Sequence, residues 1–189
     1  MSPPSCSLIA AVWALTTATR WWEGALHMVP PPGSRHQLFG KHLLKVLDPL
    51  ADRCGLIAIY ETGLYDPDAA PSGSSYRVPD QVFARPEFVG DRGVEGRAAL
   101  VVEVLSPDDE TFDKLPFYAR VGVEEVLIID PITTAFEVWR PVPGSDEEAM
   151  VKAAPAPDGT ITILAVDVRL DVVEGPRLGL RWEGGRAEI

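Results

Sequence analysis

A carboxylate inside an apolar strand is the most informative chemical feature of this sequence. Glu103 lies in the run Ala98–Leu105, which reads AALVVEVL. In a strand, alternate side chains point to opposite faces, and here both faces are apolar, so we expect the strand to be buried on both sides. An ionised carboxylate in such a place costs several kcal/mol unless it is paired or binds a metal. Two interpretations stay open: a structural Glu103 held by an arginine, by backbone donors or by solvent at the strand end, and a functional one.

Two further residues could complete a site with Glu103. Asp80 follows Pro79 at the start of the preceding predicted strand, although this pair of residue types is also common in turns. Carboxylates at the ends of neighbouring strands can converge on a hard cation such as Mg²⁺. Lys114 comes soon afterwards and could stabilise an oxyanion, which gives the minimum set for metal-assisted phosphodiester hydrolysis. The alternative for Lys114 is a surface lysine that compensates the acidic loop before it.

Several short motifs recur in order around these residues. They are VVEVLSP at 101–107, Asp113-Lys114 followed by Tyr118, GVEEV at 122–126 and IDP at 129–131, with VPD at 78–80, WEGAL at 22–26 and His36 upstream. This series resembles the Uma family of putative restriction endonucleases over roughly residues 20–175. The family is placed in the PD-(D/E)XK phosphodiesterase superfamily.

The resemblance implies a core of helix, three-stranded meander, crossover helix and strand, with a divalent-metal site. It implies that Asp80 and Glu103 are catalytic residues that bind Mg²⁺ or Mn²⁺, and that Lys114 is the catalytic lysine. Leu105 stands where the superfamily motif has its lysine, whereas the family places that lysine on the next helix, at Lys114. Tyr118 resembles a structural residue that packs this helix on the sheet.

Two departures from the family pattern affect the site. Arg20 occupies the position of a family glutamate, so Glu23 is the nearest accessory acid, and His36 is a second accessory candidate that could approach a phosphate or cap a helix. Pro116 requires the helix to begin close to residue 114, because proline is tolerated only in a first helical turn.

The elements that must position these residues follow from local patterns. We expect a bent strand or hairpin over 20–29, a helix over 35–53 capped by Ser34, and strands over 56–60, 78–83 and 98–105 separated by a loop at 62–75. A helix at about 113–120, a hairpin of 126–129 with 135–140, and strands near 161–166 and 168–173 follow. This order predicts an α/β (α+β) fold, a restriction-endonuclease-like mixed β-sheet flanked by helices, with an N-terminal β-hairpin. The predicted units are an extension or short helix at 1–19, one domain at 20–175 and a C-terminal tail at 176–189.

Charge and composition limit the function further. The chain has 189 residues and a net charge of −11, which excludes a strongly basic coat for nucleic acid. Residues 1–60 carry net +2 and residues 61–189 net −13. The basic residues Arg35, Lys41 and Lys45 on the predicted helix form a weak candidate surface for a nucleic-acid backbone.

These observations predict a Mg²⁺- or Mn²⁺-dependent endonuclease whose substrate is nucleic acid, preferentially DNA, and which can form a homodimer. The alternative is a catalytically inactive nuclease-fold module that binds nucleic acid or a protein partner, and a third interpretation is a structural oligomer. The apolar run Leu8–Leu15 is too short to span a membrane and lacks a preceding basic residue, so we expect a cytoplasmic protein with no membrane partner.

Overall fold

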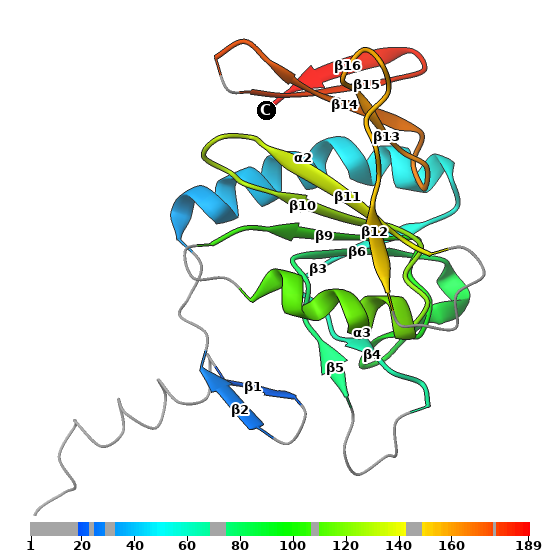
Figure 1. The fold of residues 1–189 in the computed structure, drawn as a ribbon. Coiled ribbons are helices and arrows are strands. Elements are labelled where there is room, and N and C mark those ends of the chain that lie inside the picture. The colour runs from blue at the N-terminus through cyan, green and yellow to red at the C-terminus, as the bar shows by residue number, and fades with distance from the viewer. Residues whose placement is uncertain are drawn as a thin grey trace, which may run out of the picture.

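A six-stranded mixed sheet forms the centre of the fold in the computed structural model (Figure 1). The structure describes residues 19–22, 25–28, 33–68, 75–106, 110–142, 149–175 and 177–189. The sheet has the strand order β12-β11-β10-β9-β6-β3. Its strands are β3 (Ile57–Tyr60), β6 (Gln81–Ala84), β9 (Leu100–Val104), β10 (Val126–Ile129), β11 (Phe136–Pro141) and β12 (Met150–Lys152).

The connections of this sheet match the core expected from the sequence. Strands β3, β6 and β9 form an antiparallel meander, and β10 runs parallel to β9. A parallel pair needs a crossover connection, which α3 (Leu115–Arg120) supplies together with the 3₁₀ helix η2 (Thr111–Lys114). Strands β10 and β11 form the expected antiparallel hairpin. The predicted mixed sheet flanked by helices is therefore confirmed.

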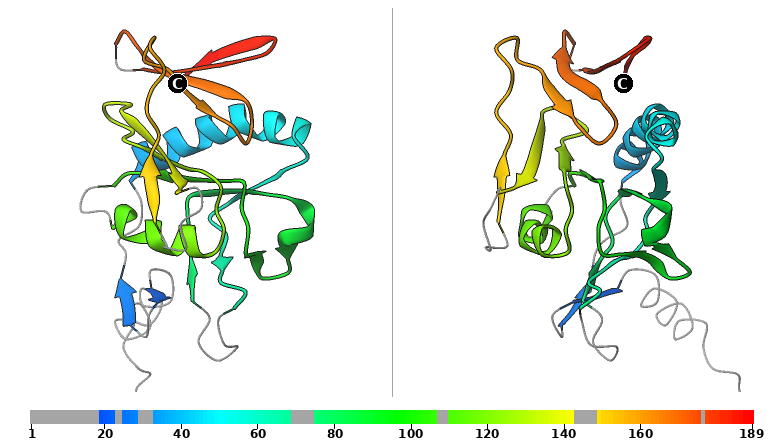
Figure 2. Two further views of the ribbon diagram at one scale, coloured as in Figure 1. Left: turned by 45° about the vertical axis from the view of Figure 1, so that its right-hand side comes forward. Right: turned by 90° about the vertical axis from the view of Figure 1, so that its right-hand side faces the viewer.

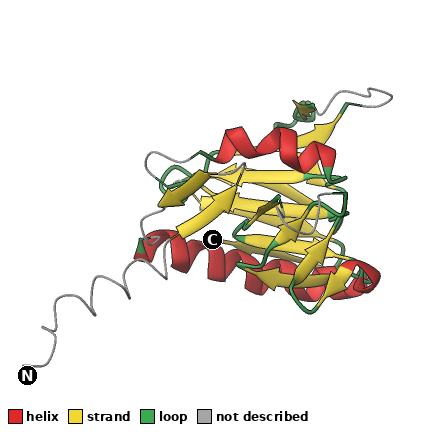
Figure 3. Ribbon diagram, turned by 90° about the horizontal axis from the view of Figure 1, so that it is seen from below, coloured by secondary structure: helices red, strands yellow, loops and turns green. Residues whose placement is uncertain are grey.

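Helix α2 (Ser34–Arg53) covers one face of the sheet and α3 lies on the other (Figure 3). Phe39, Leu43, Leu47 and Leu50 recur at three- and four-residue spacing and are buried on one side of α2. Gly55, at φ +71°, ends the helix, as predicted. Gly33 rather than Ser34 is the N-cap, so Ser34 is the first residue of the helix and the predicted cap is wrong.

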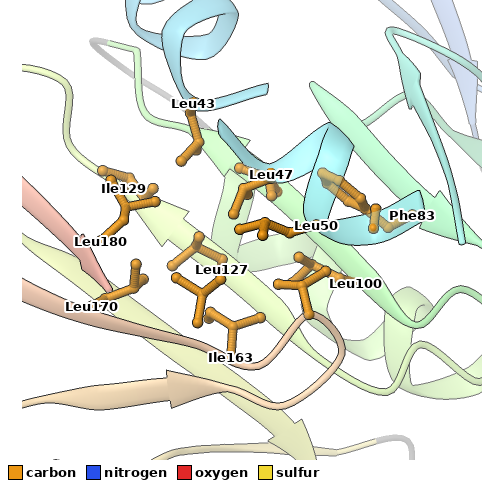
Figure 4. Packing of buried hydrophobic residues seen from close by; sticks show 14 of the residues in the cluster. Leu43, Leu47, Leu50, Phe83, Leu100, Leu127, Ile129, Ile163, Leu170 and Leu180 are labelled. Carbon is orange, nitrogen blue, oxygen red and sulfur yellow. The ribbon is translucent and has the colours of Figure 1, made fainter. Parts of the chain in front are cut away.

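Strand β9 is buried on both faces, as its apolar alternation predicts. Leu100, Val102 and Val104 belong to the core under α2, whereas Val101 belongs to the core under α3. Figure 4 shows how leucines of α2 meet side chains of the central sheet and of the C-terminal strands. Glu103 shares the face of Val101 and so points to the α3 side.

The predicted C-terminal tail at 176–189 needs correction. Strands β13 (Ile161–Ile163), β14 (Val168–Val173), β15 (Arg177–Trp182) and β16 (Gly185–Glu188) form an antiparallel sheet that lies beyond α2 (Figures 1 and 2). Leu178 and Leu180 of β15 are fully buried and join the α2 core. Strand β13 is shorter than the strand predicted near 161–166, because residues 164–167 form a turn.

A small four-stranded sheet, in the order β5-β4-β8-β7, was not predicted. It consists of β4 (Leu64–Tyr65), β5 (Tyr76–Arg77), β7 (Val89–Gly90) and β8 (Gly93–Glu95), with the 3₁₀ helix η1 (Pro86–Phe88) before β7. The predicted loop at 62–75 therefore contains a strand. The strand predicted at 78–83 begins only at Gln81, which leaves Asp80 just before β6.

The N-terminal hairpin is present: β1 (Thr19–Trp22) pairs antiparallel with β2 (Ala25–Met28). It lies at the opposite end of the molecule from the C-terminal sheet (Figure 2). The extension or helix predicted for 1–19 lies outside the described residues except for Thr19. Within the described ranges no helix is long and apolar enough to cross a membrane. The cytoplasmic location stays a prediction.

Candidate active site

The register of the central sheet brings Asp80 next to Glu103. Gln81 of β6 pairs with Val102 of β9, so one step further along both strands Asp80 faces Glu103. A direct bond fixes this arrangement, because the backbone N–H of Val104 donates to Asp80 Oδ2 at 2.7 Å. The two carboxylates are close enough that the charge of Asp80 contributes to raising the pKa of Glu103.

Glu103 is held by two donors from the helical segment that follows β9. Lys114 Nζ donates to Glu103 Oε1 at 2.8 Å, and the Tyr118 hydroxyl donates to the same oxygen. Glu103 is 3 % exposed and Lys114 6 %, so this is a buried ion pair. Burial raises the pKa of Glu103, and the cation of Lys114 opposes that rise without cancelling it. Burial and the charge of Glu103 also raise the pKa of Tyr118, which keeps its hydroxyl as a donor.

Asp80 is oriented from the helix side by His36. His36 lies in the first turn of α2, is buried, and places Nε2 at 3.2 Å from Asp80 Oδ2. The same oxygen therefore receives a backbone donor from β9 and an imidazole nitrogen from α2. The sequence predicted His36 as an accessory site residue or a helix cap. In the structure its side chain contacts the Asp80 carboxylate, and the helix cap is Gly33.

Three residues beside Asp80 were not predicted. The Tyr60 hydroxyl donates to Gln37 Oε1, Gln37 Nε2 donates to Glu61 Oε1 at 3.0 Å, and the Glu61 backbone N–H donates to the Asp80 carbonyl at 3.0 Å. Burial, together with the charges of Glu61 and Asp80, raises the pKa of Tyr60. No local motif links α2 with the end of β3, so this network had no signal in the sequence.

The donor set suits a magnesium-like cation. One oxygen of each carboxylate, Asp80 Oδ2 and Glu103 Oε1, is held by protein donors, and the structure assigns no hydrogen bond to the other oxygen of either group within the described residues. Mg²⁺ is commonly bound by one or two carboxylates, with water and phosphate oxygens as further ligands. In the described part of the chain, no group of three or more His, Cys, Asp or Glu residues could hold a metal. The fit therefore rests on Asp80 and Glu103 together with non-protein ligands.

The remaining predicted site residues lie as follows. Pro116 occupies the first turn of α3, so the helix begins directly after Lys114, as its position requires, and the lysine still reaches Glu103. Arg35, Lys41 and Lys45 are exposed on α2. Because a helix rises 1.5 Å per residue, Lys41 and Lys45 lie roughly 7 and 13 Å further along α2 than His36, away from the carboxylates. Glu23 lies outside the described residues.

A family model and a solved structure of a putative nuclease agree with this fold. The family model of Uma2, described as putative restriction endonuclease, matches residues 16–171. A crystal structure of a putative nuclease belonging to DUF820 from Anabaena variabilis superposes with a TM-score of 0.61 at 16 % identity, over 87 % of this chain and 92 % of that one. A cryo-electron microscopy structure of a DrdV–DNA complex is similar at a TM-score of 0.31 and 14 % identity, over 62 % of this chain and 12 % of that one. No curated protein matches the sequence. The family match covers most of the chain, and the protein therefore belongs to the Uma2 family of putative restriction endonucleases.

Proposed function

We propose that the protein is a divalent-metal-dependent endonuclease that hydrolyses phosphodiester bonds of nucleic acid, preferentially DNA. The observation that carries this proposal is the buried contact of 2.8 Å between Lys114 and Glu103, with Asp80 beside them directly before the neighbouring strand β6. A carboxylate and a lysine buried together, with a second, partly buried carboxylate beside them, are costly for stability. Membership of the Uma2 family and the nuclease-like fold support the same function.

Asp80 and Glu103 are the residues that would hold Mg²⁺ or Mn²⁺. Such a cation supplies a bound water of lowered pKa and neutralises charge on the phosphate. Val104 and His36 fix Asp80, whereas Lys114 and Tyr118 fix Glu103, so each carboxylate presents one oxygen in a defined direction. This preorganisation is what a metal site needs from its surrounding residues.

Lys114 has two tasks in this proposal. Burial raises the pKa of Glu103, and the cation of Lys114 opposes that rise and so favours the ionised carboxylate. Its ammonium carries three donors, so a phosphate oxygen bound next to Glu103 can accept one of them while the ion pair persists. The charge that develops on the phosphate during attack by water is then stabilised at a fixed position.

One observation favours a second function, a nuclease-fold module that binds nucleic acid or a protein without cleaving it. The Lys114 side chain is already paired with Glu103 and almost fully buried, so Glu103 partly neutralises the charge that a phosphate would meet. A site in which none of the other ammonium donors reaches the phosphate would bind a metal and a strand without turnover. The two functions differ in whether cleavage follows metal binding.

The experiment compares wild type, Glu103→Gln and the control Glu188→Gln on plasmid and single-stranded DNA. Each protein is incubated with Mg²⁺, with Mn²⁺ and with EDTA. Glu188 forms an exposed ion pair with Arg177 in the C-terminal sheet, so its variant makes the same chemical change away from the site. We expect cleavage by wild type and Glu188→Gln with either metal, and none by Glu103→Gln or in EDTA.

Other outcomes contradict the proposal in separate ways. Equal cleavage by wild type and Glu103→Gln removes Glu103 from the site. If wild type binds the metal but cleaves neither DNA, the endonuclease proposal is wrong and the inactive nuclease-fold module is the better interpretation. The homodimer predicted from the sequence stays a prediction, which sedimentation of the full chain would test.

A further inference from the structure

Two tyrosines stack on the small sheet next to the candidate active site. The ring centroids of Tyr65 and Tyr76 are 5.2 Å apart with an angle of 26° between the ring planes. The Arg92 guanidinium lies 4.5 Å from the centroid of the Tyr65 ring and is itself paired with Glu95 at 2.8 Å. The result is a stack of one guanidinium and two aromatic rings on adjacent strands.

The pairing of β4 with β5 turns these rings to the outside. Tyr65 pairs with Tyr76 and Leu64 with Arg77, so the tyrosines share one face of the small sheet and the other two residues share the opposite face. Leu64 and Arg77 are buried, and Arg77 lies 4.7 Å above the ring of Phe117 in α3. The tyrosines remain partly exposed on the outer face. The rings are therefore not required to fill the core.

Glycine backbone keeps the Tyr65 ring in place. A Cβ atom at Gly63 would lie 2.5 Å from the Tyr65 ring, and one at Gly93 would lie 3.0 Å from it and 2.3 Å from the Gly63 carbonyl. Only glycine allows the ring to approach the backbone this closely. The Tyr65 ring thus packs directly on the glycine backbone of the small sheet.

The stack lies close along the chain to the candidate active site. Tyr76 precedes Asp80 by only a short extended segment, which at most ~3.5 Å per residue places the two Cα atoms within about 14 Å. On the inner face of the same strand, the charge of Arg77 acts on Tyr118, which holds Glu103. A strand bound at Asp80 and Glu103 would therefore pass within reach of Tyr76.

The charge of the protein favours stacking over backbone contacts. At a net charge of −11, attraction to phosphates contributes little to binding, whereas base stacking on aromatic rings does not depend on protein charge. Bases inside a duplex cannot reach an outer tyrosine, but unpaired bases can. A partly exposed tyrosine stack of this kind therefore suits unpaired bases better than a duplex.

We propose that Tyr76, supported by Tyr65 and Arg92, stacks on an unpaired base next to the scissile phosphate, and that the substrate is single-stranded or locally unpaired nucleic acid. This inference rests on the proposed function, since it assigns a substrate class to the same site. It concerns binding, so it can be measured without turnover.

The experiment uses full-length protein in the Glu103→Gln background and an oligonucleotide that carries the fluorescent base 2-aminopurine, as a single strand and as a duplex. Tyr76→Leu removes the ring and Tyr76→Phe keeps it. Val172→Ala is the control, because Val172 is an exposed apolar side chain on the distant C-terminal sheet. Circular dichroism and the thermal midpoint establish that each variant is folded. If Tyr76→Leu does not fold, Tyr65→Leu is used in its place, because it removes the other ring of the stack.

We expect the single strand to bind tighter than the duplex, with quenched 2-aminopurine fluorescence. Tyr76→Leu should weaken single-strand binding by about 5- to 150-fold and abolish the quenching, whereas Tyr76→Phe and Val172→Ala should retain both. Unchanged binding and quenching in folded Tyr76→Leu would overturn the proposal. If Tyr76-dependent binding is found while wild type cleaves nothing, the stacking site stands and the endonuclease fails. If wild type cleaves and Tyr76→Leu binds as well as the protein with Tyr76, the endonuclease stands and the stacking site fails.

Discussion

Lys114 Nζ lies 2.8 Å from Glu103 Oε1, and both side chains are buried between β9 and the start of α3. The pair joins a strand of the central sheet to the crossover that leads to the next parallel strand. Removing one member of a buried pair leaves an uncompensated charge, whereas replacing both can be neutral or stabilising. Stability and activity should therefore respond differently to changes at these two positions.

Glu103→Gln should make the free energy of unfolding less dependent on pH. Burial raises the pKa of Glu103 in the folded state, so between its unfolded value, about 4.3, and the raised value the folded state binds more protons than the unfolded one. The free energy of unfolding contributed by this group therefore falls as the pH rises through that window. In EDTA, denaturant unfolding should show wild type losing stability relative to Glu103→Gln as the pH rises through this window, whatever the constant cost of leaving Lys114 without its partner. A stability difference that is constant with pH would contradict the assigned shift.

Lys114→Met should destabilise the protein at neutral pH. Glu103 would keep only the Tyr118 hydroxyl as a partner, and an unpaired buried carboxylate costs about 3 kcal/mol or more. The loss should shrink in acid, where Glu103 takes up a proton. The double variant Glu103→Gln with Lys114→Met should regain stability but not cleave, which separates the structural task of the pair from the catalytic one that we propose for it. Lys152→Met, at an exposed pair with Glu137, should change stability by less than about 1 kcal/mol.

His36→Ala should weaken metal binding without removing a proposed ligand. His36 holds Asp80 Oδ2 from α2, and loss of such an outer contact typically costs about 10- to 100-fold in metal affinity or activity. His36→Gln supplies an amide donor of similar reach and should restore part of the affinity. The measurement is titration with Mn²⁺ by calorimetry. Equal affinities for wild type and His36→Ala would show that Val104 alone orients Asp80.

Magnesium should stabilise the fold through Asp80 and Glu103. At a free concentration 100 times its Kd, a ligand that binds only the folded state adds about 2.7 kcal/mol to the free energy of unfolding. We expect this gain in denaturant unfolding of wild type and Glu188→Gln, and its loss in Asp80→Asn and Glu103→Gln. A gain that survives in both site variants would place the cation elsewhere on the protein.

The sequence was informative where a short segment carries its own pattern. The alternation around Glu103 predicted a doubly buried strand, and the leucine spacing of α2 predicted its buried face. The contact of His36 with Asp80 and the network of Gln37, Tyr60 and Glu61 join segments that are distant in sequence, so no local pattern encodes them. Their geometry depends on how α2 packs on the sheet.

The small sheet and the last two strands of the C-terminal sheet were missed for different physical reasons. Strands β4 and β5 have two residues each, which is too short for an alternating pattern to be recognised. Strand β15 reads RLGLRW and does alternate, with Leu178 and Leu180 inward, but Gly179 weakens the strand signal. Leu178 and Leu180 are buried because they pack in the same core as the leucines of α2, and this contact cannot be read from the strand's own sequence.

Residues 177–189 should be indispensable for folding, in contrast to the expected tail. Leu178 and Leu180 are fully buried against the α2 core, and each buried leucine contributes about 1.5–3 kcal/mol through burial alone. Leu180→Ala should lower the free energy of unfolding by about 2–5 kcal/mol, because a cavity remains as well. Val172→Ala, at a 56 % exposed side chain of the same sheet, is the control and should be nearly neutral. Urea unfolding of both variants measures the difference, and a Leu180→Ala protein as stable as wild type would mean that the C-terminal sheet does not support α2.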